Sequence, residues 1–354
     1  MSHSIKLLII SICFALFACD SLSKRYDSGL VTTGKVGEIL VVCDQGVWNS
    51  DIKKYLDTNL TQFIMPYFPD VTTFELIHRK PERFEGAIKR HRNTLFLKLD
   101  PSHKGGVKVK YNKVSWAKNQ HVVELIAKDY NQLLSFCKTK LMSVHNYFDE
   151  YEWKRLLKSN KRISNDKLND KLNENFKIKL SFPSGAKMVY KKKNFFRIEM
   201  PQSSRPIEFV GSGSQDPGTI FSGVMVYQYD YIDSSQMNLT SLLQARDTML
   251  KYNVPHESNG FYMGTQYNKF VYPEINDSKS DSEKVNGKEI RGMFQFKHKS
   301  KKNGTGGAFW SFHFIHPKTK KIICVSGYVD APSTTSWTHA LREIQAVWKS
   351  VQII

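Results

Sequence analysis

Apolar positions along this chain recur with two periods, one typical of helices and one typical of strands. The longest helical pattern runs from residue 115 to about residue 157, where apolar side chains recur at steps of three and four. This spacing predicts one long helix, or two helices in line, covering the chain's own sheet. Shorter patterns of the same kind predict helices at residues 51–60, 81–91, 238–250 and 337–351.

Apolar runs rich in β-branched and aromatic residues predict the strands. The run EILVVC at residues 38–43 has no polar interruption after its first residue, which is typical of a buried strand. Further strands are expected at residues 74–77, 94–99, 176–182, 186–190, 194–200, 224–232, 261–270, 290–298, 309–315 and 322–329. The predicted fold class is therefore α+β, with helices packed on mainly antiparallel sheets.

Three polar stretches interrupt these patterns and suggest how the chain is divided. Residues 159–175 are charged and rich in Asn, which predicts a linker between two lobes. Residues 274–287 have almost nothing to bury and are expected to form a mobile loop. The expected organisation is a signal peptide at 1–18, a flexible tether at 19–34, an N-terminal α+β lobe at 35–158 ending in the long helix, the linker at 159–175, and a C-terminal α+β lobe at 176–354.

The first residues have the composition of an export signal. Lys6 precedes an apolar segment at residues 7–17 that is too short to span a bilayer. The segment ends in the four residues LFAC, and Leu16 is too large for an ordinary signal-peptidase site. The alternative is an ordinary signal in which Cys19 is incidental.

The LFAC sequence resembles the lipobox of bacterial lipoproteins. That resemblance implies that the thiol of Cys19 receives a diacylglycerol and that the signal is cut just before it. The new amino group is then usually acylated, with palmitate as the expected chain. Two or more acyl chains hold a protein stably on a membrane surface. We therefore expect a cell-envelope location, with the outer membrane favoured over the inner.

Composition limits the partners that the chain can have. A chain of 354 residues, 40% of them apolar, can form two lobes with substantial cores. The formal net charge of +19 suggests an anionic envelope component as partner, although a genome-wide bias toward Lys and Asn gives the same excess. Only twelve of the 52 basic residues are Arg, and export separates the chain from nucleic acid, so no nucleic-acid partner is expected.

Cysteine and histidine spacing gives no cofactor or metal site. Cys43, Cys137 and Cys324 lie in apolar segments and are expected to be core thiols, with one disulfide left open. His313 and His316 fall on opposite faces of a predicted strand, so they do not converge on one metal. We recognise no catalytic motif, and we expect no cofactor.

Several short motifs follow one another in an order that resembles a known family. They are GEILVV at 37–42 with Trp48, HRN at 91–93, Trp116 and Ala117 with Gln120, EIRG at 289–292, GGAF at 306–309, and GYV at 327–329 with AP at 331–332. The family comprises uncharacterised lipoproteins of Bacteroidetes-type bacteria and is known as domain of unknown function 4837. Ala308 stands where a proline is expected, and Met293 where an aromatic residue is expected. The resemblance implies export and lipidation but no activity.

Seven residues from these motifs are candidates for a binding surface. Trp supplies a flat contact, Arg a fork of donors, Gln a donor and an acceptor, and Gly close backbone approach or torsions that other residues resist. If the chain is a binding module, they should converge on one concave surface; the alternative is that they serve as caps, turns and core. The candidates are Arg92, Asn93, Trp116, Gln120, Arg291, Gly306 and Gly307.

Two classes of function fit the sequence. The first is a non-enzymatic envelope lipoprotein that binds a ligand or a partner protein. The second is a hydrolase acting on an envelope polymer. A groove lined by Trp, Arg and Gly backbone favours binding, whereas a cleft with clustered carboxylates or histidines favours hydrolysis.

Overall fold

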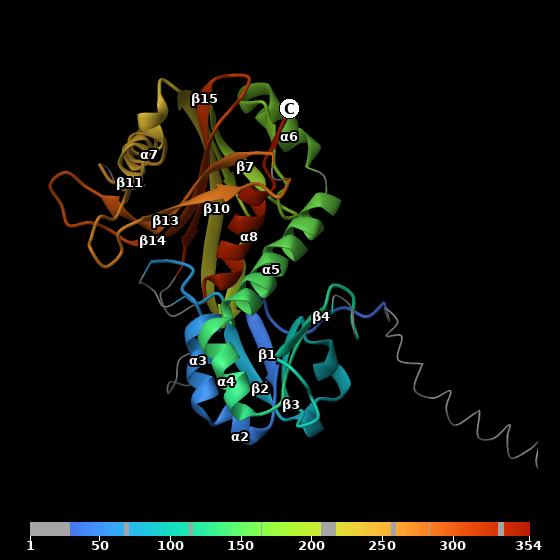
Figure 1. Ribbon diagram of the computed structural model, residues 1–354. Helices are drawn as coiled ribbons and strands as arrows, with labels where there is room; N and C mark the ends of the chain where they lie inside the picture. The colour runs from blue at the N-terminus through green and yellow to red at the C-terminus, as the bar shows by residue number, and fades with distance from the viewer. Residues whose placement is uncertain are drawn as a thin grey trace, which may run out of the picture. The chain divides into compact units, whose positions relative to one another are not determined.

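The structure is a computed structural model, and it describes residues 29–66, 71–112, 116–163, 165–206, 217–255, 260–282, 284–331 and 336–354. The predicted signal peptide, Cys19 and most of the predicted tether lie outside these ranges. The chain divides into two compact units (Figure 1). The N-terminal unit comprises the described parts of Met1–Lys53 and Leu76–Thr139, and the C-terminal unit those of Lys54–Glu75 and Lys140–Ile354. Both units contain helices and sheets, which confirms the predicted α+β class with two lobes.

The N-terminal unit is built on a five-stranded sheet in the order β2-β1-β3-β5-β4. Strands β1, β3 and β5 run parallel, and β4 is antiparallel to β5. The elements of the sheet are β1 (Glu38–Val42), β2 (Glu75–Arg79), β3 (Asn93–Leu99), β4 (Lys108–Asn112) and β5 (His121–Ala127). The helices along this part of the chain are α2 (Gln45–Trp48), α3 (Asp51–Leu60), α4 (Tyr130–Thr139) and two short 3-10 helices, Pro81–Arg83 and Gly86–Arg90.

The prediction of continuous helix from residue 115 onward was wrong in its first part. β5 occupies His121–Ala127, and its residues are almost all buried. β5 is parallel to β3 and antiparallel to β4, and it is buried on both faces, so apolar and polar residues do not alternate along it; after His121, Glu124 alone interrupts the apolar run. Such a run can extend a neighbouring helical pattern, and here it concealed the start of α4.

The C-terminal unit contains a nine-stranded sheet in which neighbouring strands run antiparallel. Its main path is β11-β13-β14-β15-β10-β8-β7, with β12 paired to β13 and β9 paired to β10. The strands are β7 (Lys187–Lys192), β8 (Phe195–Glu199), β9 (Ser203–Pro206), β10 (Pro217–Asp230), β11 (Tyr262–Thr265), β12 (Glu274–Lys279), β13 (Asn286–Lys297), β14 (Gly306–Ile315) and β15 (Lys321–Asp330). A separate small pair joins β6 (Ile178–Lys179) to β16 (Gln352–Ile353).

Helices cover both faces of this large sheet. They are α5 (Met142–Arg162), α6 (Asp166–Phe176), α7 (Leu239–Asn253) and α8 (Thr338–Lys349), with a short 3-10 helix at Ser234–Met237. Alternate residues of β10 enter different cores: Val224 and Val226 pack with α6 and α8, whereas Met225 and Tyr227 pack with α7. The period of two along a strand therefore places two apolar layers on one sheet.

Two polar stretches differ from their predicted structure. The expected linker at 159–175 is mostly helical, because α5 continues to Arg162 and α6 follows at Asp166. Leu168, Leu172 and Phe176 are buried in the core, so α6 packs against the C-terminal unit instead of linking two lobes. The expected loop at 274–287 begins with β12, an exposed edge strand whose polar composition hid its pairing with β13.

The three cysteines in the described ranges are buried and free, as expected of core thiols. Burial raises the pKa of Cys43, Cys137 and Cys324 to about 12, so these thiols are not reactive near neutral pH. Across the same ranges, no helix has both the length and the hydrophobicity that spanning a membrane requires.

Candidate functional site

Two candidate residues of the N-terminal unit have structural contacts. Gln120 is fully buried; its Nε2 donates to the carbonyls of Lys89 (2.7 Å) and His91 (2.9 Å), and its Oε1 accepts from the backbone N–H of Trp116 (2.9 Å). Asn93 is also fully buried and donates from Nδ2 to the carbonyl of Glu38 at 2.9 Å. Asn93 thereby ties β3 to β1, and Gln120 satisfies backbone groups of the segments that precede β3 and β5, so both side chains stabilise the fold.

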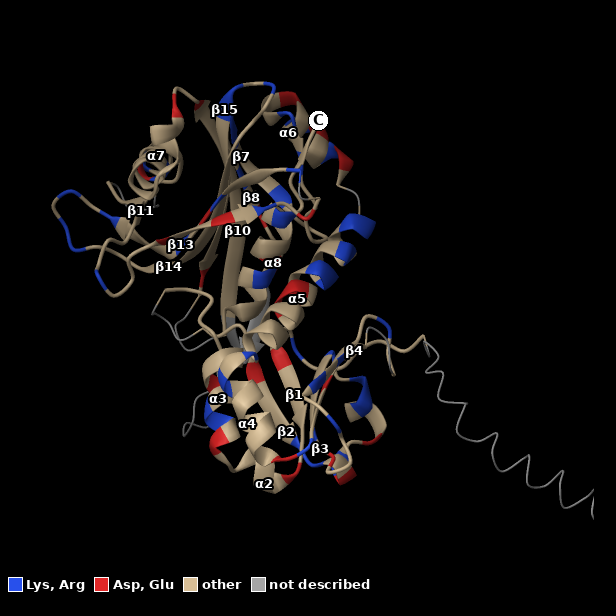
Figure 2. Ribbon diagram, in the orientation of Figure 1, with Lys and Arg blue, Asp and Glu red and all other residues tan. Residues whose placement is uncertain are grey.

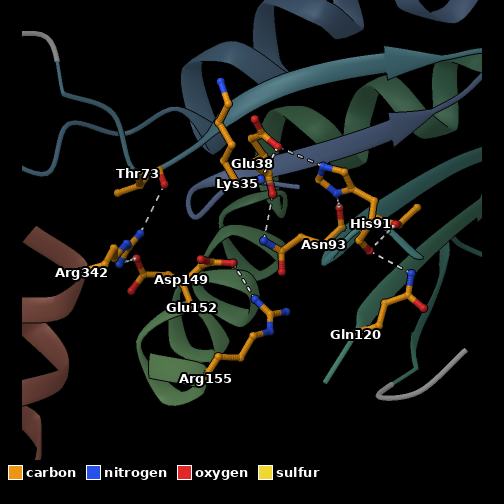
Figure 3. A network of polar contacts seen from close by, with 11 residues as sticks. Lys35, Glu38, Thr73, His91, Asn93, Gln120, Asp149, Glu152, Arg155 and Arg342 are labelled. Atoms are coloured by element: carbon orange, nitrogen blue, oxygen red, sulfur yellow. Dashed lines mark hydrogen bonds and ion pairs between the residues drawn. The ribbon is translucent and has the colours of Figure 1, made fainter. Parts of the chain in front are cut away.

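A buried acid–imidazole pair lies beside Asn93 (Figure 3). The Nε2 of His91 is 3.3 Å from a carboxylate oxygen of Glu38, and its Nδ1 is 2.9 Å from the Asn93 carbonyl. The same carboxylate oxygen of Glu38 accepts from the backbone N–H of Lys35 at 2.6 Å. Burial lowers the pKa of His91, and the Glu38 carboxylate partly opposes that shift. Because both side chains are nearly covered and internally bonded, this pair holds the start of β1 against β3.

Trp116 and Arg92 are half-buried in the same unit. The Trp116 ring meets Phe84 edge-on at 5.2 Å between centroids and lies 6.4 Å from Phe96. Trp116 and Gln120 precede β5, so the predicted helix start at this place was wrong. The backbone N–H of Arg92 donates to the carbonyl of Thr33 at 3.0 Å.

The glycine pair begins β14 in the C-terminal unit. A Cβ on Gly306 would overlap the carbonyl oxygen of Phe294, and one on Gly307 would overlap that of Val329. Neither glycine has a positive φ, so the proposed reason of unusual torsions was wrong. Close approach of neighbouring strands requires glycine here.

The structure thus assigns Arg92, Asn93, Trp116 and Gln120 to one unit and Arg291, Gly306 and Gly307 to the other. That all seven candidate residues converge on one concave surface stays a prediction. Arg291 lines a cavity, and none of the other residues of that cavity was among the seven candidates.

This charged cavity lies within the C-terminal unit and has a volume of about 540 Å³. Strands β12 to β14, helices α5 and α8, and residues 62–66 contribute to its wall. Its described lining contains three carboxylates and three cationic groups: Asp149, Glu274, Glu289, Arg291, Arg342 and Lys349. The formal charges of the lining therefore cancel.

One side of the charged cavity is tightly paired. Arg342 is fully buried, and its Nη1 lies 2.6 Å from Asp149 (Figure 3) and 2.9 Å from the amide oxygen of Gln345. Its Nη2 donates to the carbonyl of Thr73 at 3.4 Å, and its guanidinium lies 5.6 Å from the ring centre of Phe74. Arg342 therefore joins α8 to α5 and to the segment before β2.

A second arginine of the lining is loosely paired. Arg291 has one hydrogen bond, from Nη1 to the carbonyl of Ile64 at 3.1 Å. Its Nη2 lies 3.6 Å from Glu274 and its Nε 3.8 Å from Glu289, and both distances are too long for a hydrogen bond. Nε is buried and has no hydrogen-bond partner in the described part of the chain. The Nε–Nη2 edge is thus the under-bonded part of Arg291, and Nη2 is the atom of this edge that a ligand can reach.

Three ionisable groups of the lining are perturbed by burial. Burial raises the pKa of Glu289, while Arg291 and Lys349 oppose the shift. Burial lowers the pKa of Lys349, whose Nζ donates to the Lys279 carbonyl at 2.8 Å. Burial also lowers the pKa of His145, so its imidazole is neutral near pH 7.

The chemical repertoire of the lining is narrow. Thr73 is the one hydroxyl-bearing residue among the described lining residues, and its Oγ1 lies 2.9 Å from Nε2 of His145. The described chain holds no cluster of three His, Cys, Asp or Glu suited to a metal ion. His313 and His316 are both buried. The cavity is therefore equipped mainly for ion pairing and hydrogen bonding.

A sequence signal for this cavity existed. On α8, Arg342, Gln345 and Lys349 recur at steps of three and four, which places them on one face. Asp149 follows His145 by four residues on α5, and Glu289 and Arg291 alternate on β13. Polar residues that recur with the period of each helix or strand could have indicated a polar face on each element. The sequence alone could not show that these faces line one cavity.

These features define a class: an α+β protein of two units with a charged, solvent-accessible cavity in the C-terminal one. A family model described as Domain of unknown function (DUF4837) matches residues 165–350, just over half of the chain, and the chain belongs to this family. The family membership inferred from the motifs is thereby confirmed over residues 165–350, whereas the export and lipidation that the resemblance implies stay predictions. A second model, Domain of unknown function (DUF8532), matches residues 32–161.

Solved structures offer distant similarities. The Ran-binding protein Mog1p of Saccharomyces cerevisiae is 13% identical, with a TM-score of 0.27, over 50% of this chain and 90% of that one. A mutant of protein Mog1 is also 13% identical, with a TM-score of 0.26, over 50% of this chain and 91% of that one. A search of curated proteins finds no match to the chain.

Proposed function

We propose that the chain is an exported, lipid-anchored protein of a bacterial cell envelope that binds a small polar ligand in the charged cavity and catalyses no reaction. The observation that carries this proposal is the loose pairing of Arg291. Its two nearest carboxylates lie at 3.6 and 3.8 Å, whereas Arg342 in the same cavity is paired at 2.6 Å.

The contrast between the two arginines has a physical meaning. A charge taken out of water is costly unless hydrogen bonds compensate it. Arg342 has that compensation from Asp149, Gln345 and Thr73. Arg291 is 22% exposed and lacks it along one edge, so an acidic group of a ligand entering the cavity would add charge-assisted hydrogen bonds there.

The anchoring part of the proposal rests on the first residues of the chain. The short apolar segment at 7–17 and the LFAC sequence ending at Cys19 support export and lipidation. Lys and Arg are spread over both units, with several along the C-terminal half of α5 (Figure 2). A net charge of +19 favours an anionic envelope surface or partner protein nearby, and no nucleic-acid partner is proposed.

A hydrolase acting on an envelope polymer is the second candidate. It is favoured by the clustering of three carboxylates in the charged cavity and by the raised pKa of Glu289, which suits a general acid. It is disfavoured by the 2.6 Å pairing of Asp149 with Arg342, which leaves that carboxylate poorly placed as a base or nucleophile. The described lining also contains no Ser or Cys.

Affinity capture with three forms of the protein tests the proposal. The tagged wild type, Arg291→Gln and Lys288→Gln are purified from the native envelope, and bound small molecules are identified by mass spectrometry. Lys288 is the matched control because it lies on the same strand and pairs with Asp277 away from the cavity lining. A compound retained by the wild type and Lys288→Gln but lost from Arg291→Gln supports binding in the cavity. Equal retention by all three contradicts it.

The hydrolase alternative has its own test. Purified envelope polymers are incubated with the wild type and with Glu289→Gln, and released fragments are measured. Fragment release that depends on Glu289 would replace the binding proposal with hydrolysis. No release by the wild type is the expected result.

A further inference from the structure

The surroundings of Arg291 restrict the ligand's charge. Its free edge lies between two carboxylates, Glu274 from β12 and Glu289 from β13. A purely anionic ligand that approaches this edge must also approach both carboxylates, and like charges at such distances repel. A purely cationic ligand would be attracted by the two carboxylates but repelled by Arg291 itself.

The net charge of the whole lining also favours a ligand that carries charges of both signs. Three carboxylates and three cations line the charged cavity, so a ligand of net charge would leave one sign in excess in a partly buried space. A ligand that carries one acidic and one ammonium group preserves the balance. Its acidic group can accept from Nη2 on this edge of Arg291, and its ammonium has three N–H donors for Glu274 and Glu289.

We infer that the charged cavity binds a small zwitterion, with its acidic group on Arg291 and its primary ammonium group between Glu274 and Glu289. The inference rests on the proposed binding function and adds the chemical class of the ligand. Because the two carboxylates lie 3.6 and 3.8 Å from the guanidinium, the ligand's two charged groups are separated by only a few bonds. An amino acid or peptide and the head group of an aminophospholipid share this chemistry.

The two halves of the site contribute differently. Glu274 is half exposed, with 50% of its side chain accessible, so replacing it should leave the fold intact. Glu289 is 14% exposed, and burial raises the pKa of its carboxyl group, so its negative charge is the more costly of the two to leave unpaired. An ammonium group beside Glu289 would stabilise the charged form of this carboxylate.

Calorimetric titration of the purified full chain in detergent tests the inference with four probes. Glycerophosphoethanolamine, a phosphodiester, and glycylglycine carry one charge of each sign, whereas inorganic phosphate is only anionic and ethanolamine only cationic. At least one zwitterion should bind about tenfold or more tightly than either half-probe. Preference for glycerophosphoethanolamine indicates a lipid head group as the source, and preference for glycylglycine indicates an amino acid or peptide.

Variants assign the two contacts. Arg291→Gln should weaken binding of the zwitterion by about tenfold or more. Glu274→Gln should weaken this binding similarly, while its affinity for phosphate stays equal or improves. Lys288→Gln should leave all four titrations unchanged. Phosphate or ethanolamine binding as tightly as both zwitterions overturns the inference, as does the failure of every probe. Either result leaves the envelope capture experiment to decide the proposed function separately.

Discussion

Replacing each cavity arginine by methionine tests the division between a structural and a ligand-facing cation. Arg342→Met removes a fully buried guanidinium and leaves Asp149, the Gln345 amide oxygen and the Thr73 carbonyl without their donor. Breaking a buried ion pair costs about 3–5 kcal/mol. Because the Asp149 side chain is 28% exposed, water compensates part of that loss, and we expect about 2–4 kcal/mol.

Arg291→Met should cost much less. The guanidinium has one hydrogen bond, to the carbonyl of Ile64, and a bond of this kind contributes about 1 kcal/mol. The two carboxylates near it lie beyond hydrogen-bond distance, so little pairing energy is lost. The expected difference between the two variants is therefore roughly 2 kcal/mol.

Urea unfolding followed by circular dichroism measures both changes in the free energy of unfolding. A double-variant cycle with Asp149→Asn isolates the pair, and its coupling energy with Arg342→Met should be about 1–3 kcal/mol. Arg291→Met destabilising the protein as much as Arg342→Met would refute the reasoning. A coupling energy near zero would show that the 2.6 Å contact contributes no stability.

Three further predictions concern other parts of the chain. Burial lowers the pKa of His313 to about 3, so the unfolded state, with a pKa near 6.5, binds a proton first as the pH falls. The free energy of unfolding should therefore decrease by about 2 kcal/mol between pH 7 and pH 5 because of His313. Urea titrations should show a loss that is smaller by this amount in His313→Gln, and equal losses in the variant and the wild type would contradict the prediction. Gly307→Ala places a Cβ on the Val329 carbonyl and should lower the free energy of unfolding by about 3 kcal/mol or prevent folding. A Cβ at Gly106 has no atom within 4 Å, so Gly106→Ala should change the melting temperature little. Similar effects of both variants would refute the packing argument. Cys19→Ser should release the exported protein from membranes, and an intact mass showing an unlipidated wild type that begins at another residue would contradict the anchor.

Sequence patterns predicted most of the helices and strands whose burial follows the period of the element. The buried run at 38–43 became β1, and the amphipathic pattern at 51–60 became α3. β5 was missed because a strand covered on both faces does not alternate, and β12 because an exposed edge strand has little to bury. In α6, Leu168, Leu172 and Phe176 recur at steps of four, so a signal was present beneath the charged composition.

The candidate site shows where sequence reasoning stops. Arg291 was singled out from its motif, but Asp149 and Arg342 meet it only through the packing of α5 and α8 against the sheet. Gln120 and Asn93 have the same polar chemistry as binding residues and instead satisfy buried backbone groups. Chemistry of a side chain alone does not distinguish these roles, because burial and hydrogen-bond partners decide them.

A crystal structure of the protein purified directly from its native envelope tests the central claim most directly. The account predicts continuous non-protein density in the charged cavity, with an acidic group about 3 Å from Nη2 of Arg291. Ordered water alone in that cavity, with a bound envelope compound held elsewhere on the chain, would contradict it.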